Sequence, residues 1–149
     1  MPNSAHLHLI LNHFPIIGTA FVILAAGYGV ITNNDSIKKF SMVMLVLIGL
    51  ITIPVFISGG NAEGVVKGLE GISEDQIDAH EDFARVSMIA MEITAGISLI
   101  GLFLFRGPKN VPVWYGIILL VLLIAVNLMM IYTGHLGGRI SHLELMNKH

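Results

Sequence analysis

The sequence predicts an all-α fold, a four-helix transmembrane bundle that runs up-down-up-down with both termini on the outer side. Of its 149 residues, 54% are hydrophobic and 12% are charged, and the mean hydropathy is +0.80, which is typical of a membrane protein. Four apolar runs come close to the roughly 20 residues that cross a hydrocarbon core. These runs cover residues 14–31, 40–57, 86–105 and 111–133.

Polar and glycine-containing segments set the expected helix ends. The segment "TNNDS" at 32–36 follows the first helix, and "SGG" at 58–60 ends the second. The third helix begins at the capping-box pattern "SEDQ" at 73–76 and projects beyond the membrane. Pro112 fits the first turn of the fourth helix. The single membrane domain, residues 1–149, is therefore expected to contain helices over 5–31, 37–58, 74–105 and 112–142.

The distribution of cationic residues orients the bundle. The loops after the first and third helices carry Lys38, Lys39, Arg106 and Lys109 against the single acid Asp35. By the positive-inside rule these loops face the cytoplasm, so both termini are expected outside. The net charge of −2 argues against a nucleic-acid partner, and the lack of cysteine excludes disulfides, iron–sulfur clusters and thiolate metal sites.

The histidines all fall on the expected outer side of the membrane. His13 and His135 adjoin the ends of their apolar runs and share a level at the hydrocarbon boundary. His6 and His142 lie further out by roughly 10 Å along a helix, and His80 lies near their level. The sequence therefore predicts two layers of imidazole side chains, His13 with His135 in one and His6, His80 and His142 in the other.

Helical periodicity predicts which histidines face the interior. Seven residues at about 100° each return to within roughly 20° of the starting direction. His6 is therefore expected to share a face with His13, and His135 with His142, whereas His8 is expected to point elsewhere. On the third helix, His80 belongs to an inward stripe that also contains Ile77, Ala84, Ser87, Met88 and Met91.

Two layers of inward imidazoles suit one or two b-type haems, because axial histidines commonly hold haem iron and helical bundles hold cofactors in their cores. Arg139 lies between His135 and His142 on the last helix, where a guanidinium suits a haem propionate. Three glycines remove bulk beside these ligands, so that a flat macrocycle can approach the backbone: Gly134, Gly137 and Gly138.

The same residues have other interpretations. The histidines could bind zinc or copper together with Glu63, Glu81 or Asp82, although a spread over two layers fits one ion less well. Histidines at a membrane boundary also act as interfacial residues, and small residues also allow close helix packing. For Arg139 the alternatives are an interfacial anchor and a partner for Glu144.

Glu92 and Asn127 are polar residues expected deep in the membrane. An ionisable residue at that depth is a functional hypothesis by default, here a proton path or a quinone contact. The structural alternative is a hydrogen bond between Glu92 and Asn127, or between Glu92 and a serine or threonine across the bundle.

Two motifs, "NHFPIIG" at 12–18 and "TGHLGGRISH" at 133–142, resemble an uncharacterised family of small four-helix bacterial membrane proteins. That family has a His-Phe-Pro motif opening its first helix and a Thr-Gly-x-Leu-Gly-Gly motif with a following histidine closing its fourth. The resemblance implies a protein of the bacterial inner membrane that accompanies redox partners. It carries over to His13, Phe14, Pro15, Thr133, Gly134, Gly137, Gly138 and His142, whereas His135 occupies the variable position of the second motif.

These observations predict a membrane cytochrome b, an electron-transfer protein or redox-complex subunit rather than a stand-alone enzyme. Electrons are expected to pass between a quinone or other membrane partner and a periplasmic or extracellular redox protein, which the acidic segment between the second and third helices helps to dock. The alternative function is zinc or copper binding or transport at the same histidines. A homo-oligomer and a subunit of a larger complex are both compatible with the sequence.

Overall fold

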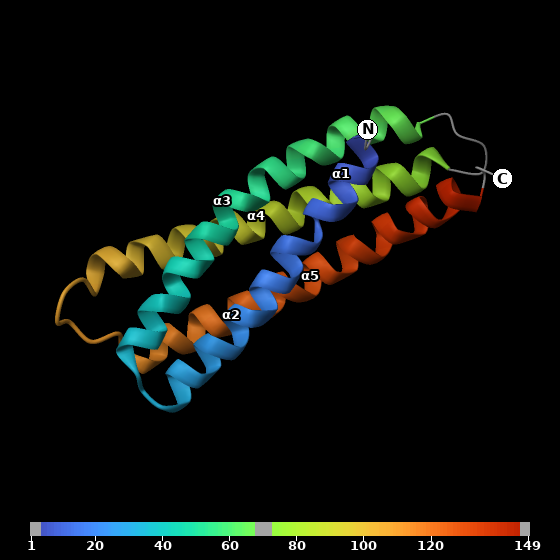
Figure 1. Cartoon of the computed structure of the whole chain (residues 1–149). Coiled ribbons are helices and arrows are strands. Elements are labelled where there is room, and N and C mark those ends of the chain that lie inside the picture. The colour runs from blue at the N-terminus through green and yellow to red at the C-terminus, as the bar shows by residue number, and fades with distance from the viewer. Residues whose placement is uncertain (1–3, 68–72, 147–149) are drawn as a thin grey trace.

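The computed structural model describes residues 4–67 and 73–146, apart from the side chains of residues 4–7, 65–66 and 141–146. This described part is all-helical and contains no strand. The helices are α1 (Ser4–Leu11), α2 (His13–Ile31), α3 (Asp35–Val66), α4 (Glu74–Leu104) and α5 (Val113–Met146). Since α1 and α2 follow each other as one interrupted helix, the chain forms the predicted bundle of four antiparallel rods (Figure 1).

The two ends of the bundle differ in the segments that they contain. The start of α1, the end of α3, the start of α4 and the end of α5 lie together at one end, which we call the terminal end (Figure 1). The α2–α3 turn and the α4–α5 loop lie at the other end, which we call the loop end. The side of the membrane on which each end lies stays a prediction.

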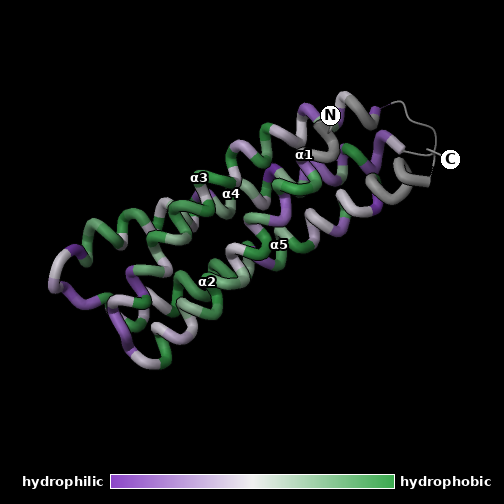
Figure 2. Tube along the Cα trace, viewed as in Figure 1, coloured by the Kyte–Doolittle hydropathy of each residue, from purple (hydrophilic) through white to green (hydrophobic). Residues whose placement is uncertain are grey.

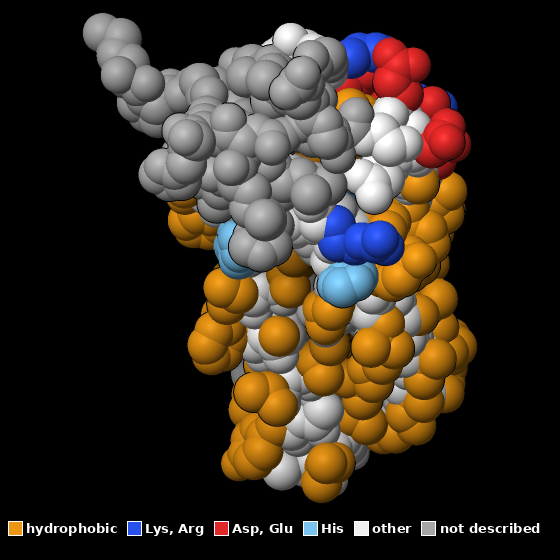
Figure 3. Space-filling view, turned by 90° about the vertical axis from the view of Figure 1, so that its right-hand side faces the viewer, with side chains coloured by type: hydrophobic (Ala, Val, Ile, Leu, Met, Phe, Trp, Pro, Cys, Tyr) orange, Lys and Arg blue, Asp and Glu red, His pale blue; other side chains and the backbone are white. Residues whose placement is uncertain are grey.

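Four segments of the described chain are long and apolar enough to cross a membrane: His8–Ile31, Asp35–Gly64, Glu74–Leu104 and Val113–Ile140. Hydrophobic residues follow the middle of these rods, and hydrophilic residues gather towards their ends (Figure 2). Large apolar side chains such as Phe21, Leu24 and Phe103 are exposed on the surface, where orange hydrophobic atoms lie beside a charged cap at the terminal end (Figure 3). An apolar surface of this extent suits lipid, so the protein is an integral membrane protein.

The centre of the bundle is packed by apolar side chains from all four rods. Val22, Leu45, Met91, Leu123 and Val126 are almost completely buried and form one cluster. Because the lipid is as apolar as these side chains, close packing and interhelical hydrogen bonds hold the rods together rather than the hydrophobic effect.

Asn127 is a buried polar residue on α5 that is bonded to α2. Its amide Nδ2 donates to the backbone oxygen of Ile16 at 3.0 Å and to Oγ1 of Thr19 at 2.7 Å. The alternative prediction, a hydrogen bond between Glu92 and Asn127, is wrong because both donated bonds go to α2. Asn127 therefore has a structural role as an α2–α5 contact.

Two lysines close the loop end. Lys38 is buried, and its Nζ donates to Oδ1 of Asn33 and to the backbone oxygen of Val111, and forms an ion pair with Asp35 at 2.8 Å. Lys39 Nζ donates to the backbone oxygens of Gly107 and Lys109, each at 2.8 Å. Both side chains therefore hold the α2–α3 turn against the α4–α5 loop.

The observed helix ends agree only in part with those predicted from the sequence. Ser73 is the N-cap of α4, where the capping-box pattern predicts it. However, α3 does not end at 58–60 but continues to Val66. Neither Gly59 nor Gly60 adopts a positive φ, and Ala62, beyond them, is buried. Both glycines therefore lie within a continuous helix instead of ending it.

The first rod is interrupted at Asn12, against the prediction of one helix over residues 5–31. The cause is Pro15, which has no backbone N–H for the carbonyl of Leu11 and whose ring clashes with that carbonyl. α1 is consequently turned relative to α2 and packs mainly along α3 (Figure 1). This change of direction decides which histidine of the first rod faces inward.

Candidate functional site

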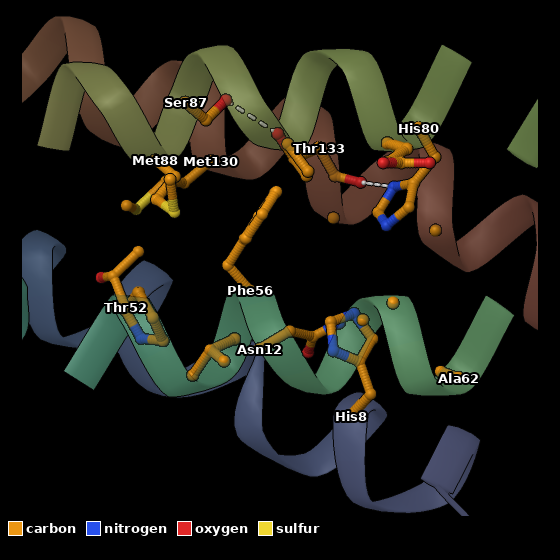
Figure 4. A pocket seen from close by; sticks show the side chains of 18 of the residues that line it. His8, Asn12, Thr52, Phe56, Ala62, His80, Ser87, Met88, Met130 and Thr133 are labelled. Carbon is orange, nitrogen blue, oxygen red and sulfur yellow. Dashed lines mark hydrogen bonds between the residues drawn. The ribbon is translucent and has the colours of Figure 1, made fainter. Parts of the chain in front are cut away.

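A cavity of about 280 Å³ lies inside the terminal half of the bundle. All five helices contribute to its wall, which is mainly apolar. Along α4 the lining runs from Ile77 to Met88, a length of roughly 16 Å. Figure 4 shows the cavity between two layers, with α1 and α3 on one side and α4 and α5 on the other.

His8 and His80 face each other across this cavity. His8 comes from α1 and His80 from α4, and their ring centroids are 6.4 Å apart with an angle of 79° between the ring planes (Figure 4). Both side chains line the cavity and both are half-buried. Two imidazoles from distant parts of the chain are therefore brought to one place.

Hydrogen bonds define which nitrogen of each ring carries the proton. Ser58 Oγ donates to the backbone oxygen of Val55 at 2.6 Å, so it accepts from His8 Nδ1 at 2.9 Å. His80 Nδ1 lies 3.1 Å from the backbone oxygen of Thr133, which can only accept. Each neutral ring therefore carries its hydrogen on Nδ1 and leaves the lone pair of Nε2 available as a metal ligand.

The partners of the two rings are themselves held in place. Oγ1 of Thr133 donates to the backbone oxygen of Met129 at 3.0 Å and lies 2.9 Å from Oγ of Ser87 on α4 (Figure 4). These hydroxyls join α4 to α5 beside His80, so the orientation of its ring is fixed from both helices. Support of this kind is typical of histidines that bind metals.

Glycines let both rings pack against helix backbone. A Cβ atom placed on Gly59 would lie 3.1 Å from Cε1 of His8, and one placed on Gly137 would lie 2.9 Å from Cε1 of His80. Both distances are shorter than ordinary van der Waals contact. One glycine on α3 and one on α5 therefore make the space that the two imidazoles occupy.

The structure brings only part of the predicted site to the cavity. Of the predicted cofactor-binding residues whose side chains it describes, His80, Gly134 and Gly137 line the cavity. His13 is exposed, and its Nδ1 bonds to the backbone oxygen of Leu9 at 2.7 Å. The side chains of His6 and His142 lie outside the described ones. The remaining predicted residues are exposed on α5 and do not line the cavity: His135, Gly138 and Arg139.

The predicted orientation of His8 is therefore wrong, as is the predicted layer of inward His13 and His135. The prediction assumed that His6 and His13 lie on one face of a continuous helix. The break at Asn12 lies between them. Because Pro15 interrupts the helix there, the two sides of the break do not share a face. Pro15 is the signal in the sequence from which this change could have been expected.

The carboxylates near the cavity form ion pairs with basic residues. Glu81 and Glu63 line its wall, but Glu81 accepts from Arg85 at 2.8 Å and Glu63 from Lys67 at 3.3 Å. Within the described ranges, no group of three or more His, Cys, Asp or Glu residues is arranged to hold a metal ion. The site is thus a pair of histidines in an apolar cavity, which suits a cofactor that brings its own equatorial ligands.

Comparisons of the chain with protein-family models, with curated proteins and with solved structures found no match. The function is therefore argued from the geometry of this cavity.

Proposed function

We propose that the protein is a membrane b-type cytochrome that holds one haem in the cavity, with His8 and His80 as the axial ligands. One observation carries the proposal: the two rings lie 6.4 Å apart across the cavity, and each is hydrogen-bonded through Nδ1. Two imidazoles that bind one metal ion from opposite sides, at about 2.0–2.1 Å per nitrogen, have ring centroids roughly 6 Å apart. The observed separation of 6.4 Å agrees with this arrangement.

The shape and lining of the cavity also support a flat apolar cofactor. The histidines come from opposite layers of the bundle, so a plane between them runs along the cavity (Figure 4). Its volume of about 280 Å³ is close to the lower end of ligand pockets, and Phe56 points into it from α3 (Figure 4). In this proposal Phe56 turns aside when the cofactor binds. Arg139 lies outside the cavity and has no part in the site.

Bound haem iron supplies a one-electron couple between the ferric and ferrous states. The chain's own residues orient the ligands. Ser58 and the Thr133 carbonyl keep the rings of His8 and His80 in the orientation and tautomer that ligation requires. The mainly apolar wall would surround the bound group. The protein thus passes single electrons between a membrane partner, such as a quinone, and a redox protein outside, where both termini lie.

A spectrum of the purified protein tests this proposal. The full chain is expressed with an adequate haem supply, purified in detergent, and recorded reduced minus oxidised, with a pyridine haemochrome assay for the haem type. We expect the sharp absorbance bands of a low-spin b haem in a ratio of one haem per chain. Protein that binds no haem under these conditions, or that contains only zinc or copper by metal analysis, contradicts the proposal.

A further inference from the structure

Glu92 is a carboxyl group in the middle of α4, away from the haem-binding cavity. It lies twelve residues from His80 and twelve from Leu104, or roughly 18 Å from each along the helix. It is the only charged residue between Arg85 and Arg106, and the facing rod has none between Lys39 and Glu63. Glu92 therefore lies within the apolar run 86–105 of α4, without a cation on either helix at its depth.

The contact between α3 and α4 surrounds this carboxyl group. A Cβ atom placed on Gly49 of α3 would lie 3.4 Å from Oε2 of Glu92 and 3.8 Å from Oε1. The carboxyl group therefore lies beside Gly49, where α3 and α4 approach so closely that the same Cβ atom would lie only 2.7 Å from Cβ of Ala95. Oε1 is buried there and has no hydrogen-bond partner in the described part of the chain. Asn127, the nearest expected partner by depth, is bonded to α2 instead.

The burial of one carboxyl oxygen without a partner favours the protonated acid. Oε1 is buried against protein and has no donor in the described part of the chain. An ionised carboxylate with no cation and no donor is costly in hydrocarbon, and binding a proton removes that cost. The observations therefore support a proton site at Glu92.

A route for the proton begins one helical turn away. Thr52, three residues after Gly49, and Met88, four residues before Glu92, both line the inner end of the cavity. Water that enters the cavity from the terminal end would come within about one turn, or roughly 5 Å, of the carboxyl group. Exchange of the proton therefore requires only a small opening between α3 and α4.

We propose that Glu92 is a proton-binding site within the bilayer, and that it exchanges its proton with water at the inner end of the cavity. The proposal does not depend on haem, since the cavity and the carboxyl group are features of the chain itself. It adds a proton site to a protein whose proposed function is to carry electrons.

Infrared spectroscopy of the purified protein at neutral pH, before and after transfer to D₂O, tests the inference. We expect a carbonyl band of a protonated carboxylic acid in the wild type that shifts in D₂O within hours. The band should be absent from Glu92→Gln and unchanged in Glu81→Gln, whose carboxylate is paired with Arg85 near the terminal end.

Two results would overturn the proposal: no carbonyl band that depends on Glu92, or a band that does not shift in D₂O. If Glu92→Gln does not fold, Glu92→Asp keeps the acid on a shorter side chain and must move the frequency of the same band. Labelling with a membrane-soluble carbodiimide, located by peptide mass, gives a second measurement. The wild type should be modified at Glu92, and no modification there would also overturn the proposal. A haem-free preparation can be used, so this test and the haem test can fail separately.

Discussion

His8 on α1 and His80 on α4 face each other across the cavity with their ring centroids 6.4 Å apart. Each ring is held through Nδ1, by Ser58 on α3 and by the Thr133 carbonyl on α5 respectively. Four helices therefore position the two imidazole rings beside each other. This arrangement explains why glycines occur where α3 and α5 pass behind the rings.

Adding a methyl group behind either ring should weaken haem binding. The Cβ of Gly137→Ala would lie 2.9 Å from His80 Cε1, and that of Gly59→Ala would lie 3.1 Å from His8 Cε1. The displaced ring loses the alignment of its Nδ1 hydrogen bond, so we expect haem affinity to fall about tenfold, or about 1.4 kcal/mol. Titration of the apoprotein with haemin measures the change.

The neighbouring Gly60 is a matched control for this prediction. No heavy atom of the described part of the chain lies within 4 Å of a Cβ placed on Gly60. Gly60→Ala should therefore leave haem affinity unchanged. Equal losses at all three positions would show that helix flexibility, and not contact with the imidazoles, explains the glycines.

Asn127→Ala should destabilise the bundle. The substitution removes the two hydrogen bonds to α2, and interhelical bonds in membranes contribute about 0.5–2 kcal/mol. Unfolding by sodium dodecyl sulfate, followed by circular dichroism, measures the loss. Leu128→Ala, at an exposed neighbouring position, is the control and should have a smaller effect. The reverse order of the two variants would contradict the assigned role of Asn127.

Lys38→Met should destabilise the loop end more than Lys39→Met. Lys38 is buried and bonded to Asn33, Asp35 and Val111, so its removal leaves the buried carbonyl of Val111 without this donor and should cost about 2 kcal/mol. The bonds of Lys39 to loop carbonyls are exposed, and water can replace them. Thermal unfolding in detergent compares the two variants. Equal losses of stability would argue against the role of the buried Lys38 in holding the α2–α3 turn against the α4–α5 loop.

The orientation of the bundle can be tested with fusions at the C-terminus. With both termini outside, an alkaline phosphatase fusion in a bacterial inner membrane should be active, and a green fluorescent protein fusion should be dark. The opposite pair of results would place the haem-binding cavity near the cytoplasm and reverse the proposed direction of partner access. The same fusions after residue 107, in the α4–α5 loop, should give the complementary result.

The sequence was sufficient to predict the bundle and the inward face of α4. Segment length and hydropathy decide whether a helix crosses a membrane, and neither depends on contacts between helices. The stripe with His80 could be predicted because α4 carries polar residues on its other side near the terminal end. Ile77, Ser87 and Met91 of that stripe are indeed buried.

The facing of the other histidines could not be predicted in the same way. α5 is apolar on nearly every side across the membrane, so periodicity does not distinguish the packed face with Gly134 and Gly137 from the exposed face with His135. In the first rod, the break caused by Pro15 separates the face of His8 from that of His13. The error on α5 arises from packing between helices, which a single-helix argument does not contain, whereas the error in the first rod arises from the local effect of Pro15.

The identity of the axial ligands tests the central claim most directly. Electron paramagnetic resonance of the ferric protein, with the visible spectrum of the same samples, should show a low-spin haem with two imidazole ligands. His8→Ala or His80→Ala should abolish this signal, and added imidazole should restore it, whereas His13→Ala and His135→Ala should retain it. A wild-type signal that survives in both His8→Ala and His80→Ala, or that is lost in His13→Ala, would contradict the assignment of the cavity as the haem site.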